Sequence, residues 1–197
     1  NSKDFEKIFF SSKNLNLEFI KKIKSSKVFF FNKKLKIPLE INYNSIHSLG
    51  NDRIFNLVGA KKEFPNKNLI IIDAGTCITM DILSSDGLFV GGRISQGLNM
   101  RYKSISQIKE LPLLNYQYTN SIYGNCTDSS IHVSVQRSII SEINDFKFKL
   151  EKQFNNVQIV LTGGDMFFLL KELKNTIFAE ENLVAIGMNE IMLLNEI

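Results

Sequence analysis

The segment Leu69-Ile-Ile-Ile-Asp73-Ala-Gly-Thr76 joins a run of apolar residues to groups that could bind ions. The run at residues 69–72 predicts a buried strand that ends at Asp73. Gly75 has no side chain to keep a ligand away from backbone N–H groups, and Thr76 adds a hydroxyl donor. A second apolar run then returns to a further carboxylate, so the turn forms a concave group of donors. Because carboxylates favour hydrated cations, the segment indicates a nucleotide-phosphate site with a metal beside it.

The same segment also fits an ordinary hairpin. Asp-x-Gly-Thr occurs in turns where Asp and Gly have only a conformational role. Taken alone, these residues leave both interpretations open, and other parts of the chain must decide between them.

Gly50-Asn-Asp-Arg53 places an acid and a guanidinium side by side at the expected start of a helix. A helix N-terminus favours anions, and Arg can bind a carboxylate or phosphate with two parallel hydrogen bonds. Asp52 could then act as a base toward a substrate hydroxyl. The structural alternative is that Asp52 caps the helix and Arg53 lies on the surface.

Thr162-Gly-Gly-Asp165 follows an apolar run and precedes a helical pattern. Paired glycines at such a turn let a flat ligand, such as a nucleotide base or ribose, approach the backbone. A plain strand-to-helix turn explains the pattern equally well. The chain has no Gly-x-x-x-x-Gly-Lys-Ser/Thr sequence, which excludes a P-loop enzyme.

The elements that must position these motifs alternate between strands and helices, which favours an α/β fold. Strands are predicted at residues 8–10, 28–31, 69–72, 78–83, 88–94 and 157–161. Helices are predicted at 15–23, from 51 to near Pro65, and at 98–109, 128–154, 166–174 and 184–194. Thr127 or Asp128 is expected to cap the longest helix.

Composition excludes several classes of protein. The 197 residues are 44% hydrophobic, enough for one large domain or two small lobes. The net charge is +4, and the lysines of the first 36 residues are scattered, which indicates a solvated surface rather than a nucleic-acid site. No apolar run approaches the ~20 residues that span a bilayer, and we expect a soluble, cytoplasmic protein. Neither the cysteines (Cys77 and Cys126, expected to be reduced and mostly buried) nor the histidines (His47 and His132) have metal-ligand spacing.

The three motifs, in this order and at these separations, resemble those of the type III pantothenate kinases, which belong to the acetate and sugar kinase, Hsp70 and actin superfamily. The similarity extends over about residues 37–187. It includes Tyr43, seven residues before Gly50, and the segments Gly91-Gly-Arg-Ile-Ser-Gln-Gly97, Gly124-Asn-Cys-Thr127 and Asn182-Leu-Val-Ala-Ile-Gly187.

The resemblance implies an α/β, actin-like ATPase (ribonuclease H-like) fold with two similar lobes, each a mixed sheet flanked by helices. We expect an N-terminal lobe at residues 1–66 and a C-terminal lobe at 67–197. The implied activity is ATP-dependent phosphorylation of pantothenate to 4'-phosphopantothenate, the first step of coenzyme A biosynthesis. The implied partners are ATP and pantothenate, without nucleic acid or membrane. The implied assembly is a homodimer with the pantothenate site near the subunit interface.

Residue roles follow by matching position, as what the resemblance implies. Asp52 matches the general base, and Tyr43, Gly50, Asn51, Asp52, Arg53 and Thr127 match the pantothenate contacts. Gly75, Thr76, Gly163 and Gly164 match the ATP site. Asp73 matches the ligand of an activating monovalent cation, K⁺ or NH₄⁺, and Mg²⁺ is expected with ATP.

The chain departs from the family pattern at its start. The family normally opens with a strand that runs into an Asp-x-Gly-Asn-Thr phosphate loop, and the first forty residues contain no such motif. Either this loop lies upstream of Asn1 or the protein has lost it, and we expect the first because Asp52, Arg53, Asp73 and Thr76 all remain. A smaller departure is Ser134, where the family often has Gly.

Three rival functions remain open at this stage. The first is a non-catalytic relative that binds nucleotide or pantothenate and acts as a regulator; its expected signature is loss of Asp52 or Arg53, and both are present. The second is a kinase of the same superfamily for a sugar or short carboxylic acid, which would usually need a longer chain. The third, a nucleic-acid-binding module, lacks a basic and aromatic platform.

Overall fold

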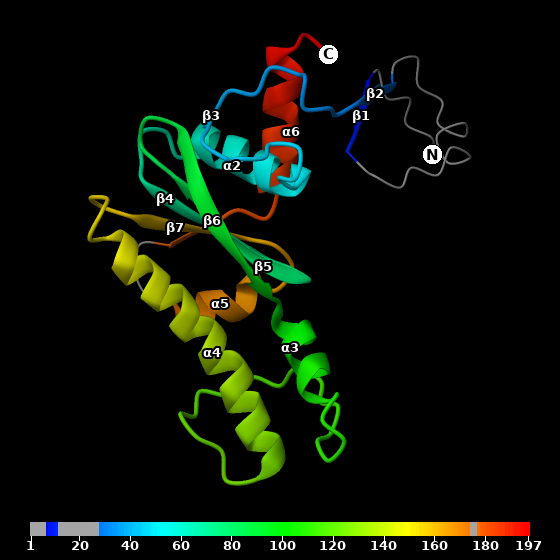
Figure 1. Ribbon diagram of the computed structural model, residues 1–197, viewed down its shortest axis with the longest axis vertical. Coiled ribbons are helices and arrows are strands. Elements are labelled where there is room, and N and C mark those ends of the chain that lie inside the picture. Colours follow the sequence, from blue (N-terminus) through cyan, green and yellow to red (C-terminus); the bar gives the residue numbers. More distant parts are fainter. Residues whose placement is uncertain (1–6, 12–27, 174–176) are drawn as a thin grey trace.

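A six-stranded mixed sheet forms the centre of the computed structural model, which describes residues 7–11, 28–173 and 177–197 (Figure 1). Its strands, in spatial order, are β3 (Glu40–Ile41), β6 (Leu88–Gln96), β5 (Cys77–Leu83), β4 (Leu69–Ala74), β7 (Gln158–Thr162) and β8 (Ile177–Ala179). Only β5 runs antiparallel to its neighbours among these strands. Two further strands, β1 (Ile8–Phe10) and β2 (Val28–Phe30), form a separate parallel pair. The ring of Phe31, which follows β2, packs edge-on to Phe55 of α2 (Asn51–Glu63).

Alternation along β4 gives the sheet two buried faces. Ile70, Ile72 and Ala74 point toward a layer formed by α3 (Leu98–Ile105), α4 (Thr127–Leu150) and α5 (Met166–Glu172). Leu69 and Ile71 point toward α2 (Asn51–Glu63) and α6 (Leu183–Leu194). Figure 1 shows these two helical layers on opposite sides of the sheet. Because side chains alternate with a period of two, Asp73 points to the face covered by α2.

Two glycines let α2 and α6 pack at very short range. A Cβ on Gly187 would lie 1.9 Å from the carbonyl oxygen of Phe55, and one on Gly59 would lie 2.4 Å from that of Leu183. No ordinary side chain fits at either contact. The close packing fixes α2, and therefore its first turn, above the sheet.

Most of the predicted elements are confirmed, with differences at their ends. α3 ends at Ile105 instead of residue 109, because the backbone passes into irregular turns after Ile105. Cys126, and neither Thr127 nor Asp128, is the N-cap of α4, because its N–H donates to the hydroxyl of Ser129 in the first turn. β8 was not predicted, and the helix predicted at residues 15–23 lies outside the described residues.

The expectation of buried cysteines is wrong. Cys77 begins β5 at the exposed end of the hairpin, and Cys126 caps the exposed end of α4; both are free thiols on the surface. Position at an element's end, rather than residue type, decides their exposure. In the part of the chain that the structure describes, no helix combines the length and apolarity needed to cross a bilayer.

The division into lobes at residue 66 stays a prediction. On the N-terminal side of that boundary, β3 hydrogen-bonds to β6 and α2 packs against α6. The described residues on both sides therefore share the six-stranded sheet and one of its helical layers.

We predict that Gly187→Ala lowers the free energy of unfolding by about 1–3 kcal/mol, the usual cost of overpacking. The new methyl group would collide with a backbone oxygen, which has no rotamer to escape into. This outweighs the gain in helix propensity of about 1 kcal/mol. Urea denaturation measures the change.

Asn189→Ala is the matched control, because Asn189 is exposed on the same helix. Its effect should stay within about 0.5 kcal/mol. Equal stability of Gly187→Ala and wild type would contradict the close helix packing.

Candidate active site

The first turn of α2 presents Asp52 to a pocket and buries Arg53. Gly50 is the N-cap, and a Cβ there would lie 2.3 Å from Asp52 Oδ1, so glycine leaves room for the carboxylate. Asp52 is exposed, whereas Arg53 is only 4% exposed. The alternative of a capping Asp52 and a surface Arg53 is therefore wrong. A pocket of about 350 Å³ adjoins this turn, and its lining is Ser11, Gly50, Asn51, Asp52, Phe55, Val184 and Met188.

Arg53 forms a buried ion pair with Asp81 of β5. Its Nε donates to both carboxylate oxygens, at 3.0 and 3.1 Å, and its Nη2 also contacts Oδ1. The rings of Tyr43 and Phe89 each lie 5.7 Å from the guanidinium carbon. Burial raises the pKa of the Asp81 carboxyl, although the hydrogen bond and charge of Arg53 act in the opposite direction. The Arg53 guanidinium is therefore held by the Asp81 carboxylate and by contacts with two aromatic rings.

Gly92 makes this pairing possible. It lies directly across from Asp81 in the register of β5 and β6. A Cβ at this position would lie 2.3 Å from Asp81 Oδ1 and 2.9 Å from Arg53 Nη2. Gly92 thus leaves space for the guanidinium over the sheet.

Asp73 lies between α2 and the turn after β7. Asn56 Nδ2 of α2 donates to Asp73 Oδ2 at 2.9 Å. Burial raises the pKa of the Asp73 carboxyl, the Asn56 hydrogen bond opposes this, and the Asp52 carboxylate adds to it. Asp52 and Asp73 also act on Asp81, so three carboxylates share one region. Such a cluster favours a bound cation.

Several oxygen atoms lie close together beside Asp73. Asp73 Oδ1 and the Ala74 carbonyl oxygen both lie 2.5 Å from the point that a Cβ on Gly163 would occupy. Gly163 has φ +88°, which also favours glycine. Asn56 Oδ1 is buried and has no partner among the described residues. Carboxylate and carbonyl oxygens can replace the hydration shell of K⁺. The described residues contain no group of three His, Cys, Asp or Glu placed to hold a metal, so backbone oxygens would have to contribute.

A second pocket, of about 370 Å³, opens at the tip of the β4–β5 hairpin. Its lining is Gly75, Thr76, Asn99, Met100, Lys103, Gly164 and Asp165. Gly97 N–H donates to Thr76 O at 3.0 Å, and Asp165 N–H donates to Ala74 O at 2.9 Å. The hairpin, the start of α3 and the turn after β7 are thus tied together. The structure brings Gly75, Thr76 and Gly164 to one pocket, with Gly163 adjoining.

Thr127 does not join the other predicted site residues within the chain. It is exposed at the N-terminal end of α4, which lies at the bottom of Figure 1, while α2 lies at the top. By contrast, the ring of Tyr43 packs against the Arg53 guanidinium, and Gly50 and Asn51 line the pocket together with Asp52.

Several residues near these pockets escaped sequence analysis. Ser11 accepts a hydrogen bond from Asn51 Nδ2 at 3.0 Å, and Met188 closes the same pocket from α6. Nothing local in the sequence marks either residue. Asn56 is one helical turn after Arg53, and Asp81 was visible only as the carboxylate that follows the second apolar run.

The chain matches the family model of the type III pantothenate kinases over residues 11–147. It belongs to this family. The curated type III pantothenate kinase of Flavobacterium psychrophilum is 39% identical over 165 residues, which are 83% of this chain and 68% of that protein. The one from Cytophaga hutchinsonii is 34% identical over 189 residues, 95% of this chain and 80% of that protein.

A solved structure supports the fold independently. The crystal structure of a conserved protein of the Baf family of transcriptional activators from Campylobacter jejuni superposes with a TM-score of 0.65. It covers 96% of this chain and 97% of its own, at 23% sequence identity, which speaks for the fold alone. The predicted family is confirmed, and so is an α/β fold in which helices flank a mixed sheet.

We predict that Asp73→Asn raises the melting temperature at neutral pH in a K⁺-free buffer. Because the pKa of Asp73 is raised in the folded state, the native protein holds this proton more tightly than the unfolded chain. Its contribution to stability therefore falls as pH rises from about pH 4 through the raised value. Asparagine stays neutral and avoids this loss, so the difference from wild type should disappear at about pH 3.

Asp86→Asn provides a control of opposite sign. The Ser84 hydroxyl lowers the pKa of Asp86, so its charged form favours the folded state above the ordinary pKa. Removing that charge should leave the melting temperature unchanged or lower it at neutral pH. A melting temperature of Asp73→Asn equal to or below that of wild type would contradict the proposed burial cost.

Proposed function

We propose that this protein transfers the γ-phosphoryl group of ATP to the hydroxyl of pantothenate, giving 4'-phosphopantothenate for coenzyme A biosynthesis. The observation that carries the proposal is the position of Asp73. It touches α2, whose first turn presents Asp52, and it also faces Gly163 beside the hairpin pocket. Asp73 lines neither pocket but contacts an element of each, and the donor and acceptor sites of a phosphoryl transfer must be adjacent.

Each pocket suits one substrate. Gly75, Thr76 and Gly164 line the hairpin pocket, with Gly163 adjoining, and the Thr76 hydroxyl and the glycine-rich turn after β7 would bind the phosphates of Mg²⁺-bound ATP. The Gly75 N–H itself donates to Cys77 O at 3.0 Å. Gly50, Asn51 and Asp52 line the pocket proposed for pantothenate. Tyr43 and the buried Arg53, which is paired with Asp81, do not line it and would support this turn from inside the protein. Phosphoryl transfer needs positioning and charge neutralisation more than covalent catalysis.

Asp52 would act as the general base. Its carboxylate is exposed to the pocket and makes no capping hydrogen bond at the start of α2, so it is available to a substrate hydroxyl. K⁺ or NH₄⁺, held by Asp73 and neighbouring oxygens, would supply positive charge beside the phosphates. The buried pair of Arg53 and Asp81 would hold the turn that carries Asp52 in place.

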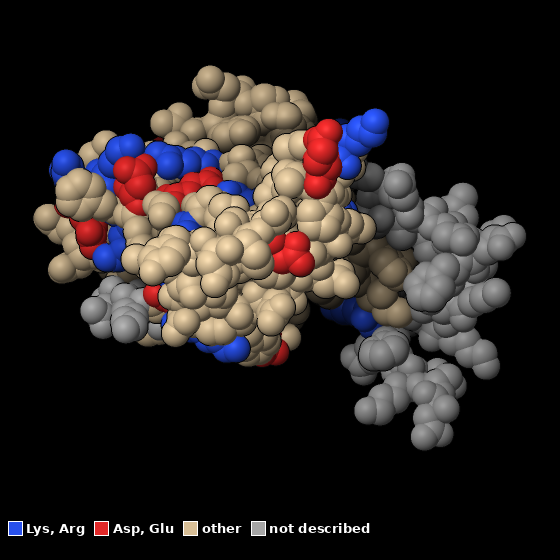
Figure 2. Space-filling view, turned by 90° about the horizontal axis from the view of Figure 1, so that it is seen from below, with Lys and Arg blue, Asp and Glu red and all other residues tan. Residues whose placement is uncertain are grey.

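A homodimer would complete the pantothenate site. Thr127 lies at the end of α4 remote from Asp52, so Thr127 of the partner subunit would have to supply this contact. The surface at that end suits association: the segment before α4 exposes apolar side chains, namely Ile108, Leu113, Ile122 and Tyr123. Figure 2, seen from below, shows a mostly uncharged surface with charges of both signs gathered toward one side.

We predict that Asp52→Asn lowers kcat for pantothenate-dependent ADP release by at least about a hundredfold, the contribution expected of a general base. The KM for pantothenate should change little, because the amide keeps the size and polarity of the carboxylate. A coupled ADP-release assay on the full-length protein measures both constants.

Glu63→Gln is the control for this variant, since Glu63 is exposed at the opposite end of α2. It should retain wild-type kcat. Near-normal turnover of Asp52→Asn would exclude its role as the base, and no pantothenate-dependent ADP release from wild type would exclude the kinase function. Turnover that is unaffected by omitting K⁺ and NH₄⁺ would exclude only the cation role of Asp73.

Mixing two inactive variants tests the shared site. In a hybrid of Asp52→Asn with Thr127→Arg subunits, one site combines an intact Asp52 with an intact Thr127 from the other subunit. We predict that the mixture regains about a quarter of wild-type activity, since half of the dimers would be hybrids with one working site each. No regain, despite subunit exchange shown by mass spectrometry, would mean that Thr127 does not act across an interface.

A further inference from the structure

Two side chains of opposite charge line the hairpin pocket without partners. Asp165 enters from the turn after β7 and Lys103 from α3. Neither the Asp165 carboxylate nor Lys103 Nζ has a hydrogen-bond or ion-pair partner among the residues that the structure describes. Asp165 is half-buried, and burial raises the pKa of its carboxyl. A half-buried carboxylate without a donor is costly unless a ligand supplies one.

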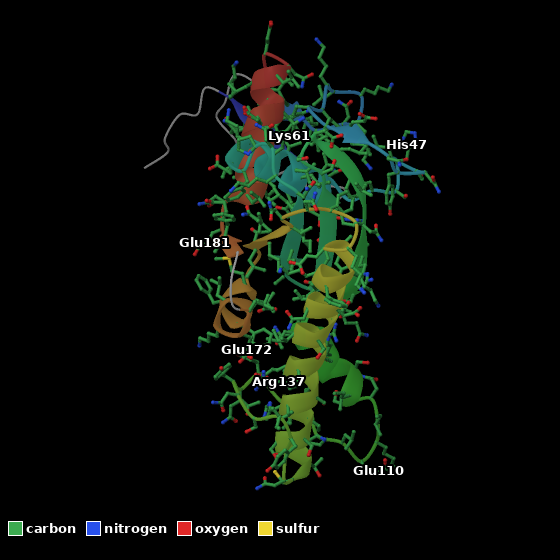
Figure 3. All side chains as sticks on the ribbon, turned by 90° about the vertical axis from the view of Figure 1, so that its left-hand side faces the viewer. His47, Lys61, Glu110, Arg137, Glu172 and Glu181 are labelled. Carbon is green, nitrogen blue, oxygen red and sulfur yellow. The ribbon has the colours of Figure 1, made fainter. Side chains whose placement is uncertain are left out.

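The position of Asp165 is fixed from both ends of its element. Its own N–H donates to Ala74 O at 2.9 Å, which ties it to the phosphate hairpin. At the other end of α5, Glu172 accepts hydrogen bonds from Arg137 Nη1 at 2.6 Å and from the Tyr118 hydroxyl at 2.7 Å. Figure 3 shows Arg137 and Glu172 facing each other. The carboxylate is therefore held at the pocket rather than carried on a free loop.

The sign of its charge limits which part of a nucleotide Asp165 can face. An ionised carboxylate only accepts hydrogen bonds and repels phosphates. The phosphates are expected at Gly75 and Thr76. These residues directly follow Ala74, whose carbonyl oxygen accepts the hydrogen bond from Asp165 N–H. Along a nucleoside triphosphate, the first donor groups after the phosphates are the ribose hydroxyls, while the amino group of the base lies further out. An acceptor this close to the hairpin therefore suits the ribose.

We propose that the Asp165 carboxylate accepts a hydrogen bond from a ribose hydroxyl of the bound nucleotide and selects ribonucleotides over deoxyribonucleotides. This specificity role rests on the nucleotide site of the proposed function. Lys103, which lines the same pocket, carries donors only and would bind the anionic part of the same ligand.

Calorimetric titration of the full-length protein with Mg²⁺ complexes of ATP, 2'-deoxy-ATP, 3'-deoxy-ATP and GTP tests the proposal. Wild type should bind at least one deoxy analogue about tenfold more weakly than ATP, the lower range for a hydrogen bond to a charged group. Asp165→Ala should lose about the same factor for ATP and nothing for that analogue, so that discrimination disappears. Asp165→Asn, which keeps the size and an acceptor oxygen, should retain part of the discrimination.

Asp86→Asn is the control, because Asp86 lies in the turn at the opposite end of β5. It should discriminate like wild type, and thermal melting should show that all variants fold. Equal affinity of wild type for ATP and both deoxy analogues would overturn the proposal. So would equal weakening of ATP and the deoxy analogues in both Asp165 variants, or an Asp165 effect confined to ATP against GTP.

The two proposals fail in distinguishable ways. Ribose discrimination that depends on Asp165, without pantothenate-dependent ADP release, would support the ribose contact and overturn the kinase function. Pantothenate phosphorylation without ribose discrimination would support the kinase function and overturn the ribose contact. Absence of any nucleotide binding would overturn both.

Discussion

The buried pair of Arg53 and Asp81 is the interaction on which the site depends. It joins the first turn of α2 to the middle of the sheet, in a region where the exposed fraction of either residue is 4% or less. Removing one member of a buried pair leaves an uncompensated charge and typically costs about 3–5 kcal/mol. The pair therefore fixes the distance of Asp52 from the sheet more firmly than apolar packing of α2 alone could, since apolar contacts have no direction.

Close backbone approaches complete the arrangement. Gly92 leaves room for the guanidinium, Gly163 leaves room beside Asp73, and Gly97 lets α3 begin against the hairpin: a Cβ there would lie 2.1 Å from Gly75 O. Each glycine serves a different neighbour, but all three keep side-chain atoms away from places where polar groups meet. The geometry of the site therefore depends on these glycines as well as on its polar side chains.

Local patterns predicted the strands around Asp73, the start of α2 and the turn after β7, because apolar alternation and glycine positions are local properties. They failed where tertiary contacts decide the outcome. Arg53 is charged and follows an N-cap, which suggests a surface residue, yet Asp81 and two aromatic rings bury it. Ser11 and Met188 reach the pocket beside Asp52 only through the packing of β1 and α6, and no short motif marks them. Thr127 matched the family by position, but its place in space depends on the length of α4.

The parallel pairing of β4 with β7 has a consequence for the order of assembly. Asp73 lies beside Thr162 in this register, so the two walls of the hairpin pocket come from segments far apart in the chain. Such non-local pairing loses loop-closure entropy before it gains contacts, which slows its formation. A nascent chain that has not reached Asp165 has no hairpin pocket. If the pocket binds nucleotide as proposed, the ligand would hold both walls together and, by mass action, stabilise the sheet against opening.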